Sequence, residues 1–252
     1  MEKETQTICG VYHTHTKYSK FFHGKDSAKD MIEEAEGLGL KEYAITDHGT
    51  KHFFGITKKN IKKLRKIIDE DNKTRNVKTL MGMEFNLLGC NGETDYFDEC
   101  ENCLDIRLMG VHRAGRTTLK NFFKFILPNL FNGGSEKVIE MNTDAYIKAI
   151  KKYKIDIITH PQEYFRVDLV RLAKACVENN CYLEINNKHL NITDDELQEL
   201  LKTDVKFIVS SDAHKKEDIL RVDRAIELLV RNNVPEERIA NLNKLPDFNK
   251  KY

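Results

Sequence analysis

The sequence predicts a single α/β domain built on a parallel sheet, and three observations support this fold class. Short apolar runs rich in β-branched residues alternate with amphipathic stretches, in the order strand then helix. The 252 residues include only four prolines, and no repeat, low-complexity tract or Pro/Gly/Ser-rich linker divides them. The composition, 40% hydrophobic and 32% charged, is that of a folded globular chain. A closed barrel and an open, doubly wound sheet both satisfy this pattern.

Seven apolar runs are expected to be strands, because β-branched and aromatic residues fill them. In chain order they are residues 8–11, 43–45, 79–83, 106–111, 155–158, 182–185 and 207–209. Six amphipathic stretches have the apolar spacing of helices. They are residues 28–38, 61–68, 143–152, 168–178, 194–201 and 218–231.

The segment between the fourth and fifth strands departs from this alternation. Residues 113–138 contain Pro128 and a Gly133-Gly134 break, which predict an inserted loop with one helix. Five basic residues against one acid give the segment a charge of +4, whereas the whole chain has a formal net charge of +1. A solvated helix face and an anion-binding role both account for this charge.

Composition also excludes several classes of protein. No apolar run approaches the roughly 18–20 residues of a membrane helix, and the first ten residues lack the apolar core of a signal peptide. The six scattered cysteines are expected to be reduced thiols. We therefore expect a cytoplasmic protein with no membrane partner. A sequence pI of about 7.6 argues against broad nucleic-acid binding, and no dinucleotide, P-loop or serine-hydrolase motif is present.

Seven of the nine histidines, and several acids, follow predicted strands. In a parallel α/β fold the carboxyl ends of all strands lie on one face, so these distant residues are expected to converge. Imidazole with carboxylate suits Zn, Mn or Fe, whereas Mg and Ca prefer oxygen ligands. We therefore predict a transition-metal site, with His52 and His189 outside it as surface or supporting residues. The residues that follow strands are His13, His15, His23, Asp47, His48, Glu84, His112, His160, Asp212 and His214.

Eight ordered motifs resemble those of the polymerase and histidinol phosphatase (PHP) superfamily, in its YcdX-like branch. The resemblance spans about residues 8–240 and implies a distorted (β/α)7 barrel, similar to a TIM barrel. The single PHP domain would cover residues 1–252, with an insertion at about 113–138. The motifs are HTHTKYS at 13–19, HGK at 23–25, ITDHG at 45–49, GME at 82–84, GVH at 110–112, ITHP at 158–161, LEINN at 183–187 and SDAH at 211–214.

The resemblance also implies a centre of three divalent transition-metal ions, each Zn, Mn or Fe. The first ion would be held by His13, His15, Glu84 and Asp212. Glu84 would bridge to a second ion, held by His112 and His160. The third ion would be held by His23, His48 and His214. Phe21 and Phe22 interrupt the family pattern before His23, so a centre of only two ions is the alternative.

Such a centre predicts phosphoester chemistry. Three divalent ions, two carboxylates and one hydroxide leave a charge of about +3, which attracts an anion. Metal ions lower the pKa of bound water toward about 7, so that hydroxide attacks phosphorus, and they neutralise the phosphoryl oxygens. We therefore expect a hydrolase of phosphoric esters that acts on a small phosphate monoester. Histidinol phosphate is one candidate substrate.

Other side chains near these motifs have two interpretations each. Arg113, Arg116 and Lys25 either clamp the substrate phosphate or are ordinary surface charges. Asp47 either orients the next histidine or assists proton transfer, and Asp212 is assigned a catalytic role as a metal ligand.

Glu184 and Asn186 end the sixth strand, where they either support the ligands or pack as polar residues inside the barrel. The sequence alone favours neither interpretation.

Two other functions remain open. The same metals could serve a nuclease or 3′-phosphoesterase acting on nucleic-acid ends, which the +4 insertion favours. A non-catalytic metal-binding regulatory module is the third alternative, and the complete set of ligands argues against it. Metal content, chelator sensitivity and a substrate panel separate the three.

Overall fold

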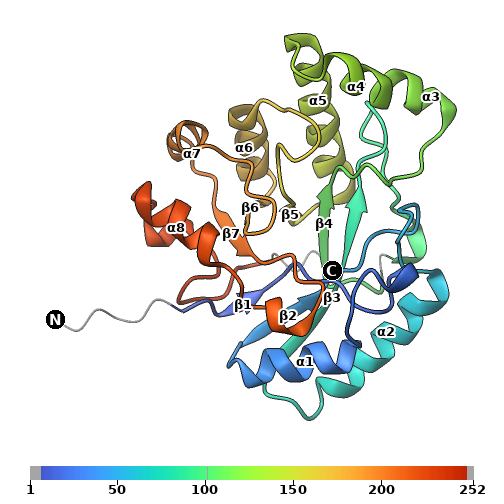
Figure 1. The fold of residues 1–252 in the computed structure, drawn as a ribbon, viewed down its shortest axis with the longest axis vertical. Helices are drawn as coiled ribbons and strands as arrows, with labels where there is room; N and C mark the ends of the chain where they lie inside the picture. The colour runs from blue at the N-terminus through green and yellow to red at the C-terminus, as the bar shows by residue number, and fades with distance from the viewer. Residues whose placement is uncertain (1–6, 101, 249–252) are drawn as a thin grey trace.

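The structure is a computed structural model that describes residues 7–100 and 102–248, so residues 1–6, 101 and 249–252 of the expected domain lie outside it. Seven parallel strands, ordered β1 to β7 in space as in sequence, form one sheet that curls into a nearly closed barrel with helices outside (Figure 1). This confirms the predicted barrel. The strands are β1 (Gly10–Val11), β2 (Glu42–Ile45), β3 (Lys78–Asn86), β4 (Ile106–Gly110), β5 (Ile157–Ile158), β6 (Tyr182–Asn186) and β7 (Phe207–Ser210).

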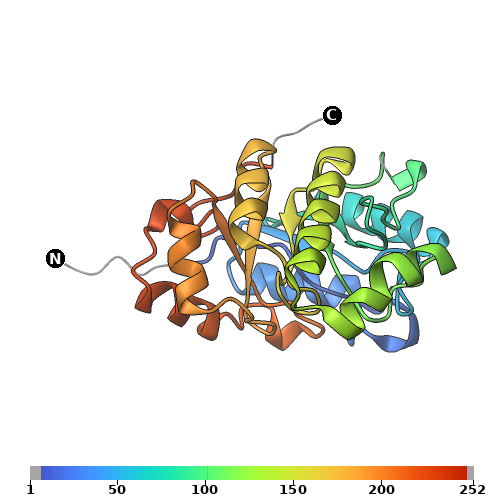
Figure 2. The same ribbon diagram turned by 90° about the horizontal axis from the view of Figure 1, so that it is seen from above.

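Eight α-helices and five shorter helical turns lie among the described residues, and together they surround the sheet (Figure 2). The helices are α1 (Ala28–Gly37), α2 (Lys58–Asp71), α3 (Leu119–Asn121), α4 (Leu127–Asn132), α5 (Glu136–Tyr153), α6 (Leu169–Glu178), α7 (Asp194–Leu201) and α8 (Asp223–Arg231). The turns are η1 (Lys20–Phe22), η2 (Asp98–Cys100), η3 (Phe122–Ile126, a π-helix), η4 (Lys216–Asp218) and η5 (Glu236–Arg238).

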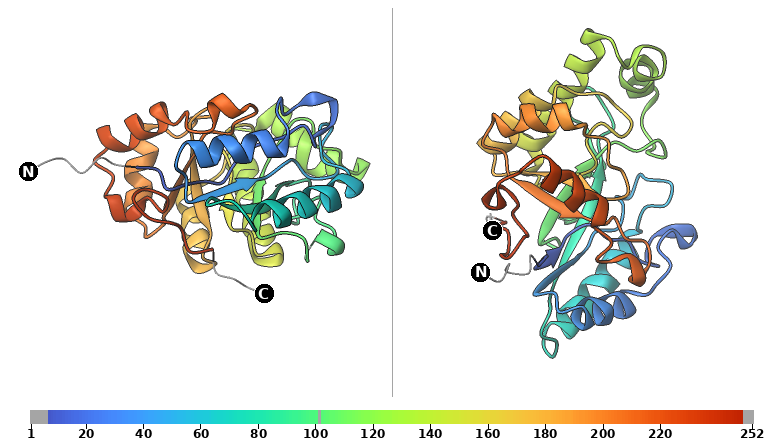
Figure 3. Two further views of the ribbon diagram at one scale, coloured as in Figure 1. Left: turned by 90° about the horizontal axis from the view of Figure 1, so that it is seen from below. Right: turned by 60° about the vertical axis from the view of Figure 1, so that its left-hand side comes forward.

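Alternate residues of each strand face two different apolar layers. The inner layer fills the barrel and includes Ala44, Leu80, Leu108 and Ile208. The outer layer packs under the helices, and α1 and α2 lie side by side there along β2 and β3 (Figure 3, left). The inner positions turn polar toward the carboxyl ends of the strands, which places the candidate ligands inside one mouth of the barrel.

Asn241 bridges the gap between the first and last strands. Its side-chain amide donates to the carbonyls of Gly10, at 2.9 Å, and Val209, at 2.8 Å. Its carbonyl oxygen accepts from the Val209 N–H at 3.0 Å. Beyond the strands, the His15 N–H donates to the Ala213 carbonyl at 2.8 Å. A side chain thus replaces part of the ladder where β1 and β7 are too short to pair.

Several helices differ from the prediction at their ends. Helix α2 extends beyond 61–68 on both sides, because its polar first and last turns carry no apolar signal. Helix α5 begins at Glu136, ahead of the predicted residue 143, since its first turns are largely exposed. The predicted helix 218–231 separates into η4 and α8.

The segment 113–138 contains more helix than the single helix expected of it. α3, η3 and α4 follow one another through residues 119–132, and α5 starts within the segment. Pro128 is tolerated because it lies in the first turn of α4, where its missing N–H is not needed. Phe125 is buried, and Asn129 exchanges hydrogen bonds with Asn142 of α5.

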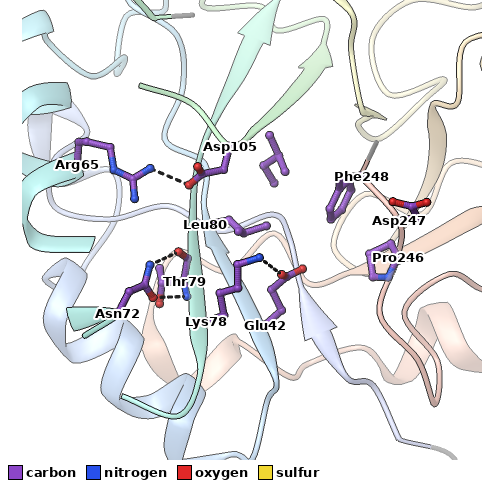
Figure 4. Close-up of a pocket in the computed structure, with 11 residues that line it drawn as sticks. Glu42, Arg65, Asn72, Lys78, Thr79, Leu80, Asp105, Pro246, Asp247 and Phe248 are labelled. Carbon is purple, nitrogen blue, oxygen red and sulfur yellow. Dashed lines mark hydrogen bonds and ion pairs between the residues drawn. The ribbon is translucent and has the colours of Figure 1, made fainter. Parts of the chain in front are cut away.

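A large cavity lies at the amino ends of the strands, opposite the candidate ligands. Its volume is about 570 Å³, and Phe248 and its neighbours close one side (Figure 4). Four of its charged side chains form ion pairs: Arg65 with Asp105 at 2.7 Å, and Lys78 with Glu42 at 3.2 Å. The described residues that line this cavity include no histidine or cysteine, so it lacks the imidazole cluster of the other mouth.

No helix among the described residues is both long and apolar enough to cross a membrane.

Candidate metal centre

All nine predicted metal ligands meet at the carboxyl end of the barrel. Three groups of three residues are found there. Within each group, the ligand atoms lie within 4.8 Å of one another. His160 and His23 adjoin these groups through Glu84 and His214. The groups are His13, His15 and Glu84; His15, Asp212 and His214; and His48, Glu84 and His112.

Glu84 is the centre of this arrangement. Its Oε1 lies 3.1 Å from His112 Nε2 and 2.9 Å from His160 Nε2. Its Oε2 lies 2.8 Å from His48 Nδ1 and 3.2 Å from His13 Nε2. The prediction placed Glu84 just after the third strand, but β3 continues to Asn86 and carries Glu84 within it. Its position on the inner face of β3 therefore aims the carboxylate into the barrel.

Asp212 anchors the other side of the centre. Its Oδ1 lies 3.1 Å from His15 Nε2 and 3.5 Å from His214 Nδ1. The backbone of Asp212 has φ of 53°, and that of His160 has φ of 27°, both in the left-handed region that residues with a side chain rarely adopt. Strained backbone of this kind persists where the surrounding structure fixes it, and functional sites are common among such places.

His23 joins the centre despite the two phenylalanines before it. Its Nε2 lies 2.9 Å from His214 Nε2, and its ring stacks on Phe54 with centroids 4.6 Å apart. Burial, with the neighbouring His214, lowers the pKa of His23 to about 4. A hydrogen bond between the two neutral rings accounts for this distance, and the same two nitrogens could instead bind one ion.

The polar atoms of the site have the pattern expected of a metal centre. Buried atoms without a hydrogen-bond partner include the Nε2 atoms of His13 and His15, Nδ1 of His48, Oε2 of Glu84 and Oδ1 of Asp212. Two ligands about 2.0–2.1 Å from one tetrahedral zinc ion lie roughly 3.3 Å apart. The distances of 3.1–3.2 Å between His15 and Asp212 and between His13 and Glu84 match this spacing. The residues therefore fit divalent metal ions.

The charge states of four predicted ligands suit metal binding, whereas, against the effect of burial, the carboxylates around His13 and His160 raise the pKa of these two imidazoles. Burial favours the neutral acid, but His13 and the other surrounding imidazoles hold the pKa of Glu84 well below its usual range. His13 similarly dominates the effect that lowers the pKa of Asp212 against burial. Burial lowers the pKa of His15 and His48 well below the ordinary value. Ionised carboxylates and neutral imidazoles are the forms that bind metal ions.

Glu184 and Asn86 contact the Nδ1 atoms of two predicted ligands. Glu184 accepts from His13 Nδ1 at 2.7 Å and from the His160 N–H at 2.6 Å. Asn86 Oδ1 lies 2.8 Å from His112 Nδ1. Of the two interpretations of Glu184, these contacts favour ligand support, which fixes imidazole orientation in metal sites.

Asp47 contacts a loop rather than the neighbouring imidazole. Its carboxylate accepts from the N–H and hydroxyl of Thr16 and from the hydroxyl of Ser19, at 2.6–2.8 Å. Burial raises its pKa to about 6, against the effect of these hydrogen bonds. The described contacts of Asp47 therefore position the loop between His15 and His23.

The three predicted phosphate-binding residues occupy different places. Arg113 lines the pocket of about 260 Å³ above the ligands, with its guanidinium 5.1 Å from the Tyr164 ring centroid. Arg116 is exposed, and its Nε lies 3.5 Å from the Lys51 carbonyl. Lys25 is exposed, and only its backbone N–H reaches the site, donating to the His214 carbonyl at 2.7 Å. The pocket is lined by neither Arg116 nor Lys25.

Sequence reasoning missed Lys188, which lines this pocket with His52 and His189, the two histidines that it interpreted as surface or supporting residues. Lys188 Nζ lies 3.2 Å from His214 Nδ1 and 3.6 Å from Asp212 Oδ2. His189 Nε2 lies 3.4 Å from Asp212 Oδ2, and the buried His52 ring lies 4.0 Å from the His48 ring. Lys188 and His189 follow the sixth strand, so the strand-end rule could have found them. His52 carries no such signal.

The fold and this site define an α/β barrel with a candidate metal centre at the carboxyl ends of its strands. The family model of the PHP domain matches residues 12–188. The chain belongs to the PHP domain family, as its motifs predicted.

Curated relatives agree with this assignment over nearly the whole chain. A probable phosphatase of Shewanella sediminis is 30% identical over 249 residues, covering 93% of this chain and 89% of its own. A probable phosphatase of Acetivibrio thermocellus is 27% identical, covering 91% of this chain and 89% of its own. Family and relatives confirm the predicted enzyme class, a hydrolase of phosphoric esters.

Solved structures are similar in fold. The histidinol phosphate phosphatase of Lactococcus lactis, complexed with zinc, L-histidinol and phosphate, aligns with a TM-score of 0.58 at 13% identity. The alignment covers 89% of this chain and 94% of that one. A histidinol phosphatase of Listeria monocytogenes has a TM-score of 0.54 at 16% identity, covering 84% and 97%.

Proposed function

We propose that this chain hydrolyses small phosphate monoesters at a centre of three divalent transition-metal ions. The observation that carries the proposal is that one buried carboxylate, Glu84, lies within 3.2 Å of the imidazoles of four predicted ligands. A second carboxylate, Asp212, lies within 3.5 Å of two further predicted ligands, His15 and His214. Together these ligands supply more donor atoms than one tetrahedral ion needs.

The division of ligands among the ions follows the family resemblance. His13, His15, Glu84 and Asp212 would hold the first ion, Glu84 with His112 and His160 the second, and His23, His48 and His214 the third. The 2.9 Å approach of His23 to His214 supports the third site. His48 also lies close to Glu84, at 2.8 Å, so it would stand between the second and third ions.

When bound, the ions supply a nucleophile from water at neutral pH and neutralise charge on the phosphoryl oxygens. The chain itself orients the substrate. Arg113 and Lys188 bring two positive charges to the pocket, where they can bind phosphate oxygens. Glu184 and Asn86 keep the imidazoles in the tautomer and orientation that bind metal.

The substrate is proposed to be small because the pocket over the ligands is only about 260 Å³. The ligand of the Lactococcus lactis enzyme makes histidinol phosphate a reasonable first member of a substrate panel. Free nucleotides and single-stranded DNA complete the panel, because the basic segment 113–138 favours a polyanion as the alternative substrate.

Metal analysis and a chelator test the proposal together. We expect about three ions per chain, hydrolysis of para-nitrophenyl phosphate that is lost with chelator, and recovery with Mn or Zn. Glu84→Gln should lower kcat at least about 100-fold and release metal, since Glu84 serves two ions. Glu99→Gln, an exposed acid paired with Lys58, is the matched control and should leave both unchanged. Full activity in metal-free protein, or in Glu84→Gln, would refute the proposal.

A further inference from the structure

A pair of exposed phenylalanine rings lies beside the metal centre and has no role in it. Phe21 is 65% exposed and Phe53 is 51% exposed. Their rings stack with centroids 4.9 Å apart and an angle of 15° between their planes. Two large aromatic faces left together in water are a feature of binding surfaces, because burial of that area by a ligand is favourable.

Aromatic contacts connect this pair to a predicted metal ligand. Phe54 lies edge-on to Phe53 at 5.1 Å and to Phe21 at 6.3 Å. The Phe54 ring stacks on the His23 imidazole at 4.6 Å, with only 5° between the planes. Phe54 and His23 both line the pocket over the metal ligands. The exposed pair is therefore separated from the pocket by a single ring.

The backbone holds Phe21 in an unfavourable conformation. Its φ of 55° and ψ of 30° lie in the left-handed region, which a bulky side chain rarely adopts. Neighbouring hydrogen bonds fix the segment: the Lys20 N–H donates to the Phe54 carbonyl at 2.8 Å, and the His23 N–H donates to the Lys20 carbonyl at 3.3 Å. The fold thus keeps Phe21 at a cost, which is typical of segments that contact ligands.

The size of the pocket indicates what would use these rings. Pockets that enclose a whole small ligand have volumes of about 300–1,000 Å³. A pocket of about 260 Å³ accepts the phosphate and the atoms next to it, and any further part of a small phosphate monoester would extend over the rim. Lys20 directly precedes Phe21, and Lys51 lies two residues before Phe53 in the chain. Stacked aromatic rings among cationic side chains are the features that bind nucleobases and their phosphates.

We propose that Phe21 and Phe53 form a stacking platform for the base of a nucleoside monophosphate, either free or at the end of a nucleic-acid strand. This inference rests on the proposed function, since the phosphate of the same molecule would lie in the metal centre. The bond broken is the phosphate ester, with water supplying the hydroxyl of inorganic phosphate and the proton of the released nucleoside.

The test compares the wild type with Phe53→Leu on two substrates. Leucine keeps an apolar side chain but lacks a flat π surface. For AMP we expect KM to rise about tenfold, because stacking of one base contributes that much or more, with kcat nearly unchanged. For glycerol 3-phosphate, which has no ring, kcat and KM should stay within about twofold. A second variant, Phe21→Leu, should repeat the result.

The matched control is Phe131→Leu, because Phe131 is 77% exposed on α4 and makes no described ring contact with the rim. This variant should change neither kcat nor KM for either substrate. Thermal unfolding should show that all three variants fold. Equal changes for AMP and glycerol 3-phosphate, or no change for either, would each overturn the platform. Hydrolysis of a 5′-phosphorylated oligonucleotide is the last comparison. If it depends on Phe53 more strongly than hydrolysis of AMP does, the platform binds the nucleotide at the end of a strand.

Binding measurements separate this inference from the proposed function. If no phosphate ester is hydrolysed, the proposed function fails, and calorimetry with metal-loaded protein still tests the platform. Phe53→Leu should then weaken binding of AMP about tenfold and leave binding of inorganic phosphate unchanged. Equal binding of AMP by wild type and Phe53→Leu would exclude the platform whatever the activity.

Discussion

At the scale of single residues, the site depends on carboxylates that stay ionised where water does not reach them. Glu84 is fully buried, yet the imidazoles around it hold its pKa well below the usual value. Glu184 has the same property, because His13 outweighs the effect of burial and lowers its pKa. Glu184 differs from Glu84 in its contacts, since it receives hydrogen bonds from the far side of His13 and from the backbone of His160. It is therefore a positioning residue.

Glu184→Gln tests this role. The amide keeps the shape of the side chain but loses the charge that fixes the His13 tautomer. We expect metal affinity to fall about 10–100-fold, measured by competition with a chromophoric chelator, with a similar loss of kcat. A purely structural role would lower the free energy of unfolding and leave metal affinity intact. The matched control is Glu217→Gln, which makes the same chemical change at an acid in the turn η4.

At the scale of secondary-structure elements, short strands leave the barrel dependent on side chains for closure. β1 and β5 have two residues each, and no strand pairing between β1 and β7 is found among the described residues. The Asn241 side chain makes three hydrogen bonds across that gap, with Gly10 and twice with Val209. It is completely buried, so loss of its side chain would leave these groups without that partner away from water.

Asn241→Ala should therefore destabilise the protein strongly. An unsatisfied buried polar group costs about 1–3 kcal/mol, so the free energy of unfolding should fall by about 3 kcal/mol or more. Urea denaturation followed by circular dichroism measures this change. Asn91→Ala is the matched control, because Asn91 is exposed, and it should change stability by no more than about 0.5 kcal/mol. A loss below about 1 kcal/mol in Asn241→Ala would mean that the barrel closes without this residue.

At the scale of the whole molecule, the metal ions are expected to stabilise the fold as well as the reaction. The ligands come from segments far apart in the chain, from His13 to His214, so they form a site only in the folded protein. Binding to the folded state alone stabilises it by mass action. The buried ligand atoms without hydrogen-bond partners strengthen this expectation, because ions would satisfy them.

Metal removal should lower thermal stability. With free metal at 100 times its Kd, one site contributes about 2.7 kcal/mol to the free energy of unfolding, which chelator would remove. Scanning calorimetry with and without chelator measures the loss, and Glu84→Gln should respond much less than the wild type. An identical Tm for loaded and metal-free wild-type protein would contradict a metal centre formed by folding.

The sequence by itself predicted the order of the strands and the nine candidate ligands that the structure brings to one mouth of the barrel. Apolar runs and histidines are local features, and the parallel α/β rule that strand ends share one face turns their order into a site. The same rule, applied a few residues past the end of the sixth strand, would have predicted that Lys188 and His189 lie at the site.

Only the tertiary structure decided how those residues meet. Glu84 lies within β3, and Asn241 bridges the gap between the first and last strands. The Asp47 carboxylate contacts Thr16, and Arg116 and Lys25 lie outside the pocket. The physical reason is that side-chain direction depends on barrel closure and loop path. Both are set by contacts between residues far apart in the chain, which no local pattern encodes.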